Sequence, residues 1–438
     1  MKLRKNPVYI LIIVAIILLL PVTIRMLDSS TIPGNDNYYY LNADNSLFNH
    51  PYTFLLSLSD SVQFHLFLPV LLGLLSILFL HQLYLGLSAW EHSIFLLLLV
   101  FSPAFITSFT TLNPYSLLFL LLITGFYFLT RKNEKVRWIA LPIFLLVPLF
   151  DIFSSLFLLL LLIPYAYLKR EKISMLMVLF VTVSAIIVLL ALSKPFFYTP
   201  FVMYSRMTAL LSDFGGLRGL NVFVLILAFG GIAKTWKKAF SFPLYLLIIF
   251  LGFSYWITAE VMLFITIIVT LWAGIALAQL AKRTWKLEAI KSFTLFVIVL
   301  GVLFSSLSVS DRLINLGPSD EIQRSLVQVK EFTNEDDIIL SSLHNGEIIK
   351  YYTQAQPLLE YQTQNFNEKR EIARTIFDSS YVQDELFNQH GITVFYITPD
   401  MKQEKVVQQN EGLLFTFKNE KFTMVREENG IETWRYDD

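Results

Sequence analysis

Long apolar runs separated by polar turns fill the chain up to residue 309, and this pattern predicts transmembrane helices. A helix needs roughly 20 apolar residues to cross a bilayer core about 30 Å thick. We expect about eleven spans on this pattern, the shorter ones tilted or partly re-entrant. The predicted spans are residues 8–26, 65–85, 93–111, 114–130, 137–150, 152–168, 173–193, 219–234, 241–256, 259–279 and 291–309.

The pattern changes at Ser308–Arg312, where the last apolar run ends. We expect a transmembrane domain at residues 1–309 and a small α/β domain at residues 310–438. The Asn429-Gly430 turn predicts a closing antiparallel hairpin. The predicted helices of the second domain are residues 320–332, 346–352, 366–377 and 381–390, and its predicted strands are 337–340, 357–360, 392–397, 412–417, 422–426 and 431–436.

The composition agrees with a membrane protein, because 55% of the 438 residues are hydrophobic and only 16% are charged. The chain contains no cysteine, which excludes disulfides, thiolate catalysis and cysteine-ligated metals. The net charge of zero hides a split, since the residues from 310 onward hold 13 basic and 23 acidic side chains. This acidic segment argues against nucleic acid as a partner.

Basic residues gather on one side of the predicted spans, and this sets the predicted orientation. The predicted inner turns hold seventeen of them, and the outer turns before residue 310 hold only Arg25, Lys194, Arg206 and Arg218. The positive-inside rule therefore predicts a multi-pass protein of the cell membrane with its N-terminus inside and its C-terminal domain outside. The basic start Met1–Asn6, with no small-residue cleavage site after the first apolar run, indicates a retained signal-anchor helix.

The turn Pro33–Tyr40 places Asp36 just beyond the first predicted span, at the outer bilayer edge. A carboxylate there can take a proton from an acceptor hydroxyl or amide, or hold a divalent cation. The same residues also fit an Asx-type turn, with the tyrosines that follow at the level of the lipid headgroups. The residues alone leave both interpretations open.

The predicted outer loop 194–218 supplies three cations, Lys194, Arg206 and Arg218. Such a set suits a lipid phosphate or pyrophosphate, and ordinary headgroup contact explains it equally well. Asp213, in a Gly-rich stretch of the same loop, is either a second acidic ligand or a turn residue.

Other polar residues at the predicted outer ends of spans have plain structural explanations beside functional ones. Asn113 either positions a ligand or forms a helix-breaking Asn-Pro turn. Asp151 fits a hairpin turn between two spans, and Glu260 is either a charge favoured by the dipole at a helix start or a site residue. His50 fits a surface residue of the first outer loop.

Three segments carry a resemblance to a known superfamily, and no nucleotide-binding loop, zinc signature or nucleophile elbow appears. Gly34–Tyr39 resembles the Gly-x-Asp-x-Tyr-Tyr element of GT-C membrane glycosyltransferases, most of all archaeal relatives of the catalytic subunit of oligosaccharyltransferase. Ser212–Leu217 is similar to an acid-Gly-Gly stretch that these proteins place before a later helix. Ser341–Glu347 follows a predicted strand, at the position of their Trp-Trp-Asp-Tyr-Gly-type acceptor loop.

The resemblance implies transfer of a sugar or glycan from a polyprenyl-phosphate-linked donor to a protein, lipid or glycan acceptor on the outer face of the membrane. It implies Asp36 as the acceptor-side base or as a ligand of Mg or Mn, and Asp213 as a second carboxylate. The remaining implied site residues are Arg206, Arg218 and Lys194 at the donor phosphate, and Asn37, His50, Asn113, His344 and Asn345 on the acceptor side.

Three departures from the family pattern keep a second hypothesis open. Asn113 stands where active enzymes usually offer another acid, and Ser341–His344 replace the tryptophans and aspartate of the acceptor loop. Glu260–Phe264 occupies the region of an expected Arg-Phe element. The second hypothesis is a non-catalytic scaffold of the cell envelope. A transporter is disfavoured, because the predicted spans carry few polar residues at depth.

Overall fold

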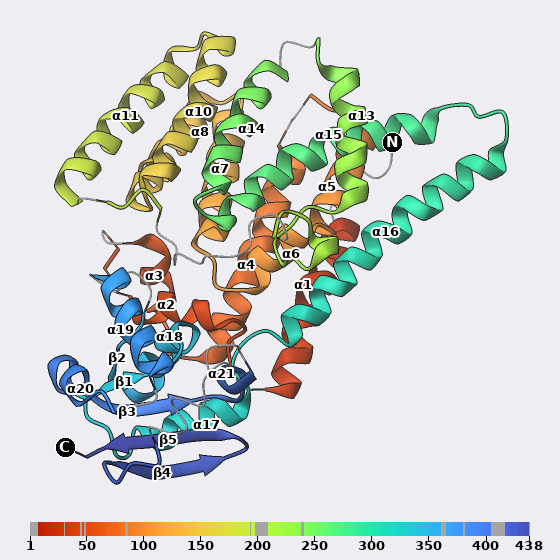
Figure 1. Ribbon diagram of the computed structural model, residues 1–438. Helices are drawn as coiled ribbons and strands as arrows, with labels where there is room; N and C mark the ends of the chain where they lie inside the picture. The colour runs from red at the N-terminus through yellow and green to blue at the C-terminus, as the bar shows by residue number, and fades with distance from the viewer. Residues whose placement is uncertain are drawn as a thin grey trace. The chain divides into compact units, whose positions relative to one another are not determined.

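The computed structural model describes residues 8–29, 31–43, 46–47, 50–83, 86–192, 194–197, 209–237, 241–360, 365–379, 382–403 and 417–437. The chain forms two compact units (Figure 1). The helical unit comprises Met1–Leu27 and Asp44–Asn315. The sheet unit comprises Asp28–Ala43 and Leu316–Asp438, so a segment of the first predicted outer loop belongs to it.

The helical unit is built from apolar helices, several of which begin at a residue that caps them. Ser88 forms a capping box with Glu91 at the start of α5, and Ser102, Asn113, Asp151 and Asn221 cap later helices. The α-helices are α1 (Val8–Asp28), α3 (Pro51–Leu56), α4 (Val62–Gln82), α5 (Ala89–Val100), α6 (Pro103–Thr110), α7 (Pro114–Leu129), α8 (Glu134–Arg137), α9 (Ala140–Leu146), α10 (Ile152–Lys169), α11 (Lys172–Leu192), α13 (Val222–Thr235), α14 (Ser241–Tyr255), α15 (Met262–Lys282) and α16 (Glu288–Ile314). Short 3-10 helices are η3 (Val147–Leu149), η4 (Ser212–Phe214) and η5 (Ala259–Val261).

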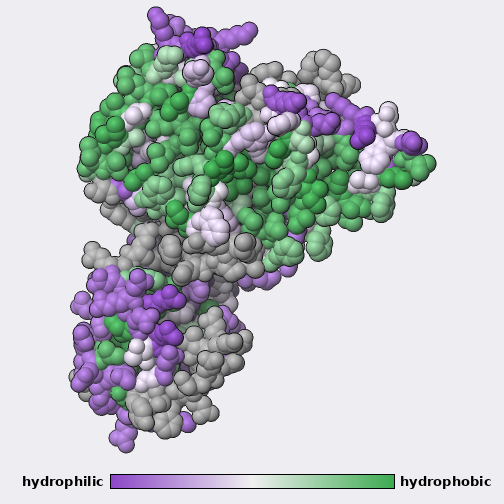
Figure 2. All heavy atoms as spheres, turned by 45° about the horizontal axis from the view of Figure 1, so that its top comes forward, coloured by the Kyte–Doolittle hydropathy of each residue, from purple (hydrophilic) through white to green (hydrophobic). Residues whose placement is uncertain are grey.

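Six helices of the described chain are long and apolar enough to cross a membrane, namely α1, α4, α10, α11, α15 with η5, and α16. The pair α5 and α6, bent by 59°, makes a seventh candidate. Helices α7, α13 and α14 are apolar but shorter. A broad apolar surface covers the helical unit in Figure 2, and Leu179, Ile187 and Leu190 of α11 contribute to its exposed apolar side chains. The chain is therefore a helical, multi-pass membrane protein; the count of eleven spans stays a prediction.

The stretch predicted as one span at residues 137–150 is divided among the end of α8, α9 and η3. Pro142 lies in the first turn of α9, where a missing N–H is tolerated. Pro148 lies in η3, where its ring and the restricted residue before it end the α-helical ladder. The two prolines thus explain why the stretch is broken.

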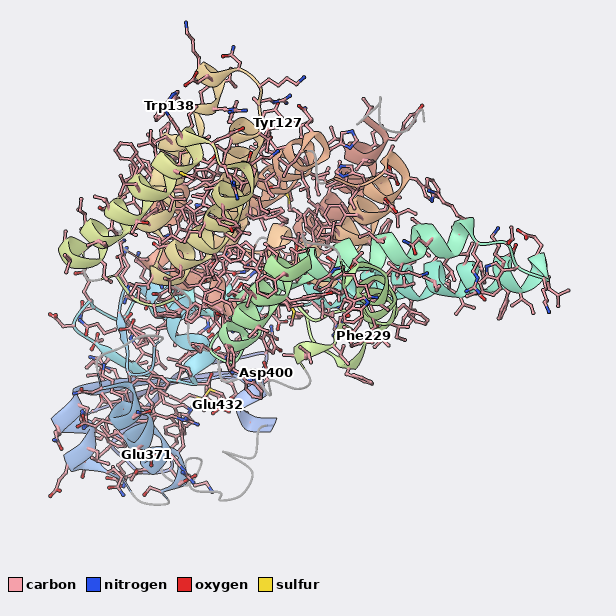
Figure 3. All side chains as sticks on the ribbon, turned by 90° about the horizontal axis from the view of Figure 1, so that it is seen from above. Tyr127, Trp138, Phe229, Glu371, Asp400 and Glu432 are labelled. Carbon is pink, nitrogen blue, oxygen red and sulfur yellow. The ribbon has the colours of Figure 1, made fainter. Side chains whose placement is uncertain are left out.

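Basic side chains at the predicted inner turns contact neighbouring side chains through a cation–π contact and an ion pair. The Arg131 guanidinium lies 3.9 Å from the ring centroid of Tyr127. Arg137 Nη1 lies 2.9 Å from Glu171 Oε2. Tyr127 and Trp138 mark this end of the helical unit in Figure 3.

The sheet unit contains a five-stranded mixed sheet in the order β2-β1-β3-β5-β4. β1 lies parallel to β2 and β3, and β5 pairs antiparallel with β3 and β4, which confirms the predicted closing hairpin. The strands are β1 (Ile338–Leu340), β2 (Gln356–Pro357), β3 (Ile392–Ile397), β4 (Phe422–Glu428) and β5 (Ile431–Tyr436). The helices are η2 (Asn35–Asn37), α2 (Tyr38–Asn42), α17 (Asp320–Val329), α18 (Leu343–Thr353), α19 (Phe366–Asp378), α20 (Asp384–His390) and α21 (Pro399–Gln403). Residues 412–416 of the strand predicted at 412–417 lie outside the described residues.

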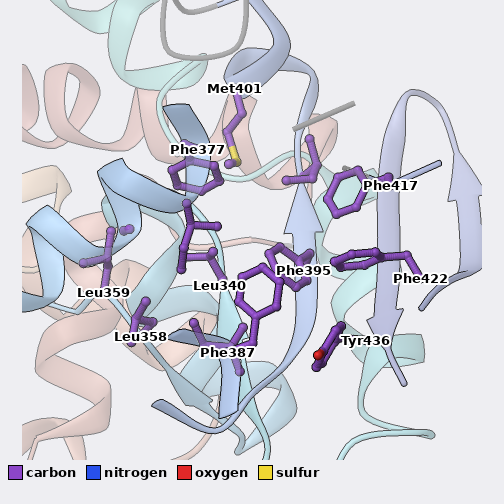
Figure 4. Close-up of a cluster of buried hydrophobic side chains, with 14 residues drawn as sticks. Leu340, Leu358, Leu359, Phe377, Phe387, Phe395, Met401, Phe417, Phe422 and Tyr436 are labelled. Atoms are coloured by element: carbon purple, nitrogen blue, oxygen red, sulfur yellow. The ribbon is translucent and has the colours of Figure 1, made fainter. Parts of the chain in front are cut away.

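An aromatic core holds the sheet unit together (Figure 4). Phe387 of α20 lies 5.3 Å from Phe395 of β3 and 5.0 Å from Tyr436 of β5, measured between ring centroids. Phe377 of α19 and Leu340 of β1 belong to the same cluster. Burying such side chains contributes about 1.5–3 kcal/mol each, so the core fixes the scaffold on which the polar residues of this unit stand.

Candidate functional site

Polar side chains at the starts of three helices in the helical unit are buried and joined by hydrogen bonds. Asn113 Oδ1 accepts the backbone N–H of Tyr115 at 2.9 Å and so caps α7. Asp151 Oδ1 accepts the backbone N–H of Ser154 at 2.7 Å and caps α10. Glu260 lies in η5, directly before α15. We call Asn113, Asp151, Glu260 and the residues that bind them the helix-start cluster.

Glu260 is the acid at the centre of one half of this cluster. Asn113 Nδ2 donates a hydrogen bond to Glu260 Oε2 at 2.5 Å. Arg218 Nη1 forms an ion pair with Glu260 Oε1. The side chain of Glu260 is 8% exposed and that of Arg218 24% exposed, so the pair is mostly shielded from water. Each oxygen of this carboxylate is therefore engaged by a different donor.

Asp151 is the acid of the other half, and its carboxylate is also engaged at both oxygens. Asp151 Oδ1 accepts the Ser154 hydroxyl at 2.5 Å in addition to the backbone N–H. The Tyr115 hydroxyl donates to Asp151 Oδ2 at 2.9 Å. Because Tyr115 also donates its N–H to Asn113, this residue links the two halves.

Lys194 lies close enough to Asp151 to feel its charge. Burial lowers the pKa of the Lys194 ammonium, and the Asp151 carboxylate raises it in part. The residues after Lys194 run along the start of α10, where Ile152 N–H donates to Pro195 O at 3.2 Å and Phe153 N–H to Phe196 O at 3.0 Å. The backbone thereby holds the segment that carries this lysine.

His50 is a buried neutral residue in the same region, which corrects the expectation of a surface residue. Its Nδ1 accepts the backbone N–H of Tyr52 at 3.2 Å, and its ring lies 5.0 Å from that of Phe150. Burial lowers the pKa of His50 well below its ordinary value, and the charge of Lys194 lowers it further. The Tyr52 hydroxyl in turn accepts the N–H of Asn113 at 3.1 Å. His50 therefore supports the cluster as a helix cap.

The loop that carries Arg218 is fixed from both sides. Thr107 Oγ1 of α6 donates to the carbonyl of Leu217 at 2.7 Å. Ser212 N–H donates to Leu220 O at 3.0 Å, and a Cβ at Gly219 would collide with the backbone of Ser212. This close approach explains the glycine there.

Asp213 performs a capping role at the other end of that loop. Its Oδ2 accepts the backbone N–H of Val222 at 2.7 Å. Arg312 Nη2 of α16 donates to the carbonyl of Ser212 at 3.0 Å, and the charges of Arg312 and Asp213 interact. Arg206, predicted at the donor phosphate, lies outside the described residues.

Asp36 lies in the sheet unit, partly exposed, on η2. Gly34 precedes it with a φ of 87°, a backbone conformation that favours glycine. Gly34 N–H donates to Leu316 O at 3.2 Å, and Asn37 Nδ2 donates to the carbonyl of Pro33. The turn is therefore built by its own Gly and Asn residues and tied to the start of the C-terminal segment.

The helix after Asp36 packs on α18. Tyr38 is fully buried, its hydroxyl lies 3.2 Å from that of Tyr352, and burial raises the pKa of Tyr38. Asn42 Nδ2 donates to Glu347 O at 2.8 Å and to Glu347 Oε2 at 3.0 Å. These contacts hold the Asp36 segment against α18.

The two acceptor-side residues predicted on α18 differ in placement. Asn345 is buried, and its Nδ2 donates to Ser341 Oγ at 3.1 Å, inside the sheet unit. His344 is exposed. The structure thus brings Asp36, Asn37, His344 and Asn345 together in one unit, on η2 and α18.

Glu260 and Asp151 are the cluster residues that the sequence did not assign to a site. Each had a sufficient local explanation, as a helix-start charge or a turn, and the structure bears out that both lie at helix starts. The one available signal was that Asn113, Asp151 and Glu260 all stand at predicted outer ends of spans.

A divalent cation does not fit the helix-start cluster. No group of three or more His, Asp or Glu side chains with metal-ligand spacing occurs in the described part of the chain. Mg²⁺ and Mn²⁺ prefer several oxygen ligands, with carboxylates not already neutralised. Glu260 and Asp151 instead accept hydrogen bonds and face their own cations.

The fold of the chain is shared with GT-C membrane glycosyltransferases over nearly its whole length. No protein-family model matches the chain, and no curated protein matches its sequence. Among solved structures, the archaeal oligosaccharyltransferase AglB from Archaeoglobus fulgidus, in complex with an inhibitory peptide and a dolichol-phosphate, is similar with a TM-score of 0.61 and 14% identity. The match covers 98% of this chain and 74% of AglB.

ArnT from Cupriavidus metallidurans is similar with a TM-score of 0.52 and 12% identity, and the match covers 97% of each chain. ArnT bound to undecaprenyl phosphate gives a TM-score of 0.50, at 12% identity and coverage of 96% of this chain and 97% of ArnT. At these identities the likeness shows the fold. It confirms the structural resemblance expected from the sequence.

Proposed function

We propose that the chain is a membrane glycosyltransferase that moves a sugar or glycan from a polyprenyl-phosphate-type lipid to an acceptor on the outer face of the membrane. The observation that supports this most is the fold, which matches two proteins whose structures contain dolichol-phosphate or undecaprenyl phosphate. The predicted outward orientation of the C-terminal domain is part of the proposal.

In this reaction the bond between the sugar anomeric carbon and the lipid phosphate oxygen breaks, and a bond from that carbon to an acceptor oxygen or nitrogen forms. Asp36 takes the acceptor proton, a role that its partial exposure permits. The lipid phosphate leaves with the electron pair. Arg218 and Lys194, together with Arg206, stabilise its charge.

The remaining roles follow the sequence-based expectation. Asp213 provides a second carboxylate in addition to Asp36. The residues that support the acceptor side are Asn37, His50, Asn113, His344 and Asn345. A Mg or Mn ion at Asp36 stays a prediction, and no step above depends on it.

The decisive experiment compares Asp36→Asn with wild type in lipid nanodiscs supplied with polyprenyl-phosphate sugars extracted from membranes. Wild type consumes donor, and Asp36→Asn loses at least about 100-fold of the rate, as expected for a general base. Asp60→Asn is the matched control, because Asp60 is exposed in the same predicted outer loop. Equal donor consumption by wild type and Asp36→Asn contradicts the role of Asp36.

A non-catalytic scaffold of the cell envelope is the second candidate, and Asn345 favours it. The amide of Asn345 is bonded inside the sheet unit, at the position where the resemblance implies contact with an acceptor. This candidate predicts that no donor pool is consumed by wild type, while the intact chain still binds a partner through its acidic sheet unit.

A further inference from the structure

Three acids of the helical unit, Glu260, Asp151 and Asp213, lie near basic residues. Glu260 pairs with Arg218, and the charge of Asp151 acts on Lys194. The charge of Asp213 acts on Arg312. The Glu260–Arg218 ion pair sums to zero at neutral pH, and Lys194 lies within the field of Asp151, so both acids of the helix-start cluster have a basic residue beside them.

The oxygen atoms of the two buried acids are also occupied. A carboxylate offers about four lone-pair positions. Asp151 uses three of them for Ser154 N–H, Ser154 Oγ and Tyr115 OH. Glu260 accepts from Asn113 Nδ2 on one oxygen and from Arg218 on the other. An incoming ion would have to compete with these donors, of which Asn113, Tyr115 and Ser154 are buried, and any donor that it displaced would lose its partner.

We propose that Arg218, paired with the Glu260 carboxylate that Asn113 also binds, is the permanent cation of the helix-start cluster, and that Glu260 and Asp151 bind no divalent ion. The guanidinium carries its charge permanently and presents several N–H donors in a plane. Arg218 thus supplies at a fixed position the positive charge that a phosphate requires, and this second half rests on the proposed function.

The loop contacts fit this assignment. Thr107 holds the carbonyl of Leu217 at 2.7 Å, next to Arg218 in the chain. The Arg218 side chain is 24% exposed, whereas that of Glu260 is 8% exposed. The acid orients the cation, and the cation is the group that meets the ligand.

The claim that Glu260 and Asp151 bind no divalent ion is tested with Mn²⁺ as the only probe. EDTA-treated protein in nanodiscs is titrated with MnCl₂ while free Mn²⁺ is measured by electron paramagnetic resonance. Wild type, Glu260→Gln and Asp151→Asn are expected to bind the same amount of Mn²⁺. Loss of one bound ion in either folded variant overturns the proposal.

A double variant keeps the test decisive if Glu260→Gln fails to fold. Asn113→Asp with Arg218→Ala places a second carboxylate beside Glu260 and removes the guanidinium. One additional Mn²⁺ per chain is expected, because two uncompensated carboxylates then face each other. No gain over wild type overturns the claim that Arg218 occupies the place of an ion.

The claim that Arg218 supplies the positive charge for a phosphate is tested with undecaprenyl phosphate as the probe. Arg218→Gln is expected to weaken its affinity at least about tenfold, Arg218→Lys by less, and EDTA not at all. Arg137→Gln, which removes a guanidinium at the predicted inner turns, is the control and should bind as wild type does. Unchanged affinity in Arg218→Gln overturns this half and counts against the proposed function, whereas the Mn²⁺ result stands separately.

Discussion

Glu260 and Asp151 of the helical unit differ in placement from Asp36 of the sheet unit. In the helical unit, Glu260 and Asp151 are buried at helix starts, and each is held by donors and by a cation. In the sheet unit, Asp36 stands partly exposed on a single 3-10 turn. The buried acids are held by hydrogen bonds at helix starts and so contribute to the stability of the fold, whereas the partial exposure of Asp36 suits a role in chemistry.

Replacing the buried acid Glu260 is expected to lower the free energy of unfolding most. Glu260→Gln leaves the mostly shielded Arg218 without its counter-charge, which should cost about 2–3 kcal/mol, somewhat below a fully buried pair. Thermal unfolding in detergent measures it. Asp36→Asn should cost less than about 1 kcal/mol.

Glu171→Gln is the matched control for the ion pair. Glu171 pairs with Arg137 at 2.9 Å and is 34% exposed, against 8% for Glu260. Arg137 is shielded about as well as Arg218, but it keeps its hydrogen bond to the carbonyl of Arg131, so loss of Glu171 should cost less than about 1 kcal/mol. A comparable loss of stability in Glu260→Gln and Glu171→Gln would break the comparison, because the burial of Glu260 would then not matter.

The next effect concerns pH and His50. Its pKa is lowered in the folded state, so below the ordinary value near 6.5 the unfolded chain binds a proton that the folded chain does not. Above about pH 6.5 the titration of His50 therefore does not change the free energy of unfolding. Below that pH the free energy of unfolding falls by up to about 1.4 kcal/mol per pH unit.

The measurement is the melting temperature of wild type and His50→Asn from pH 7.5 to 5. Asparagine can still cap α3 but does not titrate, so the variant should show a flatter profile. Identical pH profiles would show that His50 is not buried as a neutral ring.

The smallest effect sharpens the role of the Arg218 loop. Thr107→Val removes the hydrogen bond to Leu217 O and should cost about 1 kcal/mol in thermal unfolding. Thr110→Val is the control on the same helix, because the Thr110 hydroxyl donates only within α6, to Ile106 O at 2.8 Å. An equal cost in both variants would indicate that the loop does not depend on Thr107.

Local signals in the sequence predicted much of the fold. The helical positions of the apolar runs, the change of pattern near Ser308–Arg312 and the closing hairpin at Asn429-Gly430 all depend on residues close together in the chain. The same is true of the Asn-Pro turn at Asn113, which caps α7. The Gly-Asn turn around Asp36 likewise matches η2.

The candidate site could be predicted only in part. The chain contains Arg218 and Asn113 as candidates, but Glu260, which joins them, had a complete local explanation as a helix-start charge. Asn113 and Glu260 are 147 positions apart, and no periodicity reports a contact over that separation. His50 was wrongly predicted as a surface residue, because its burial depends on Phe150, far along the chain.

The sequence predicted most of the long helices, four of the five strands and the change from a membrane part to a polar part, but not the break within residues 137–150. These are properties of short windows, set by side-chain period, by backbone preference and by local hydrogen bonds. The three-dimensional structure was needed to show that Glu260 binds Arg218 and Asn113, and that residues 28–43 belong to the same unit as the C-terminal segment. Such pairings follow from how helices pack against one another, and packing depends on the whole chain at once.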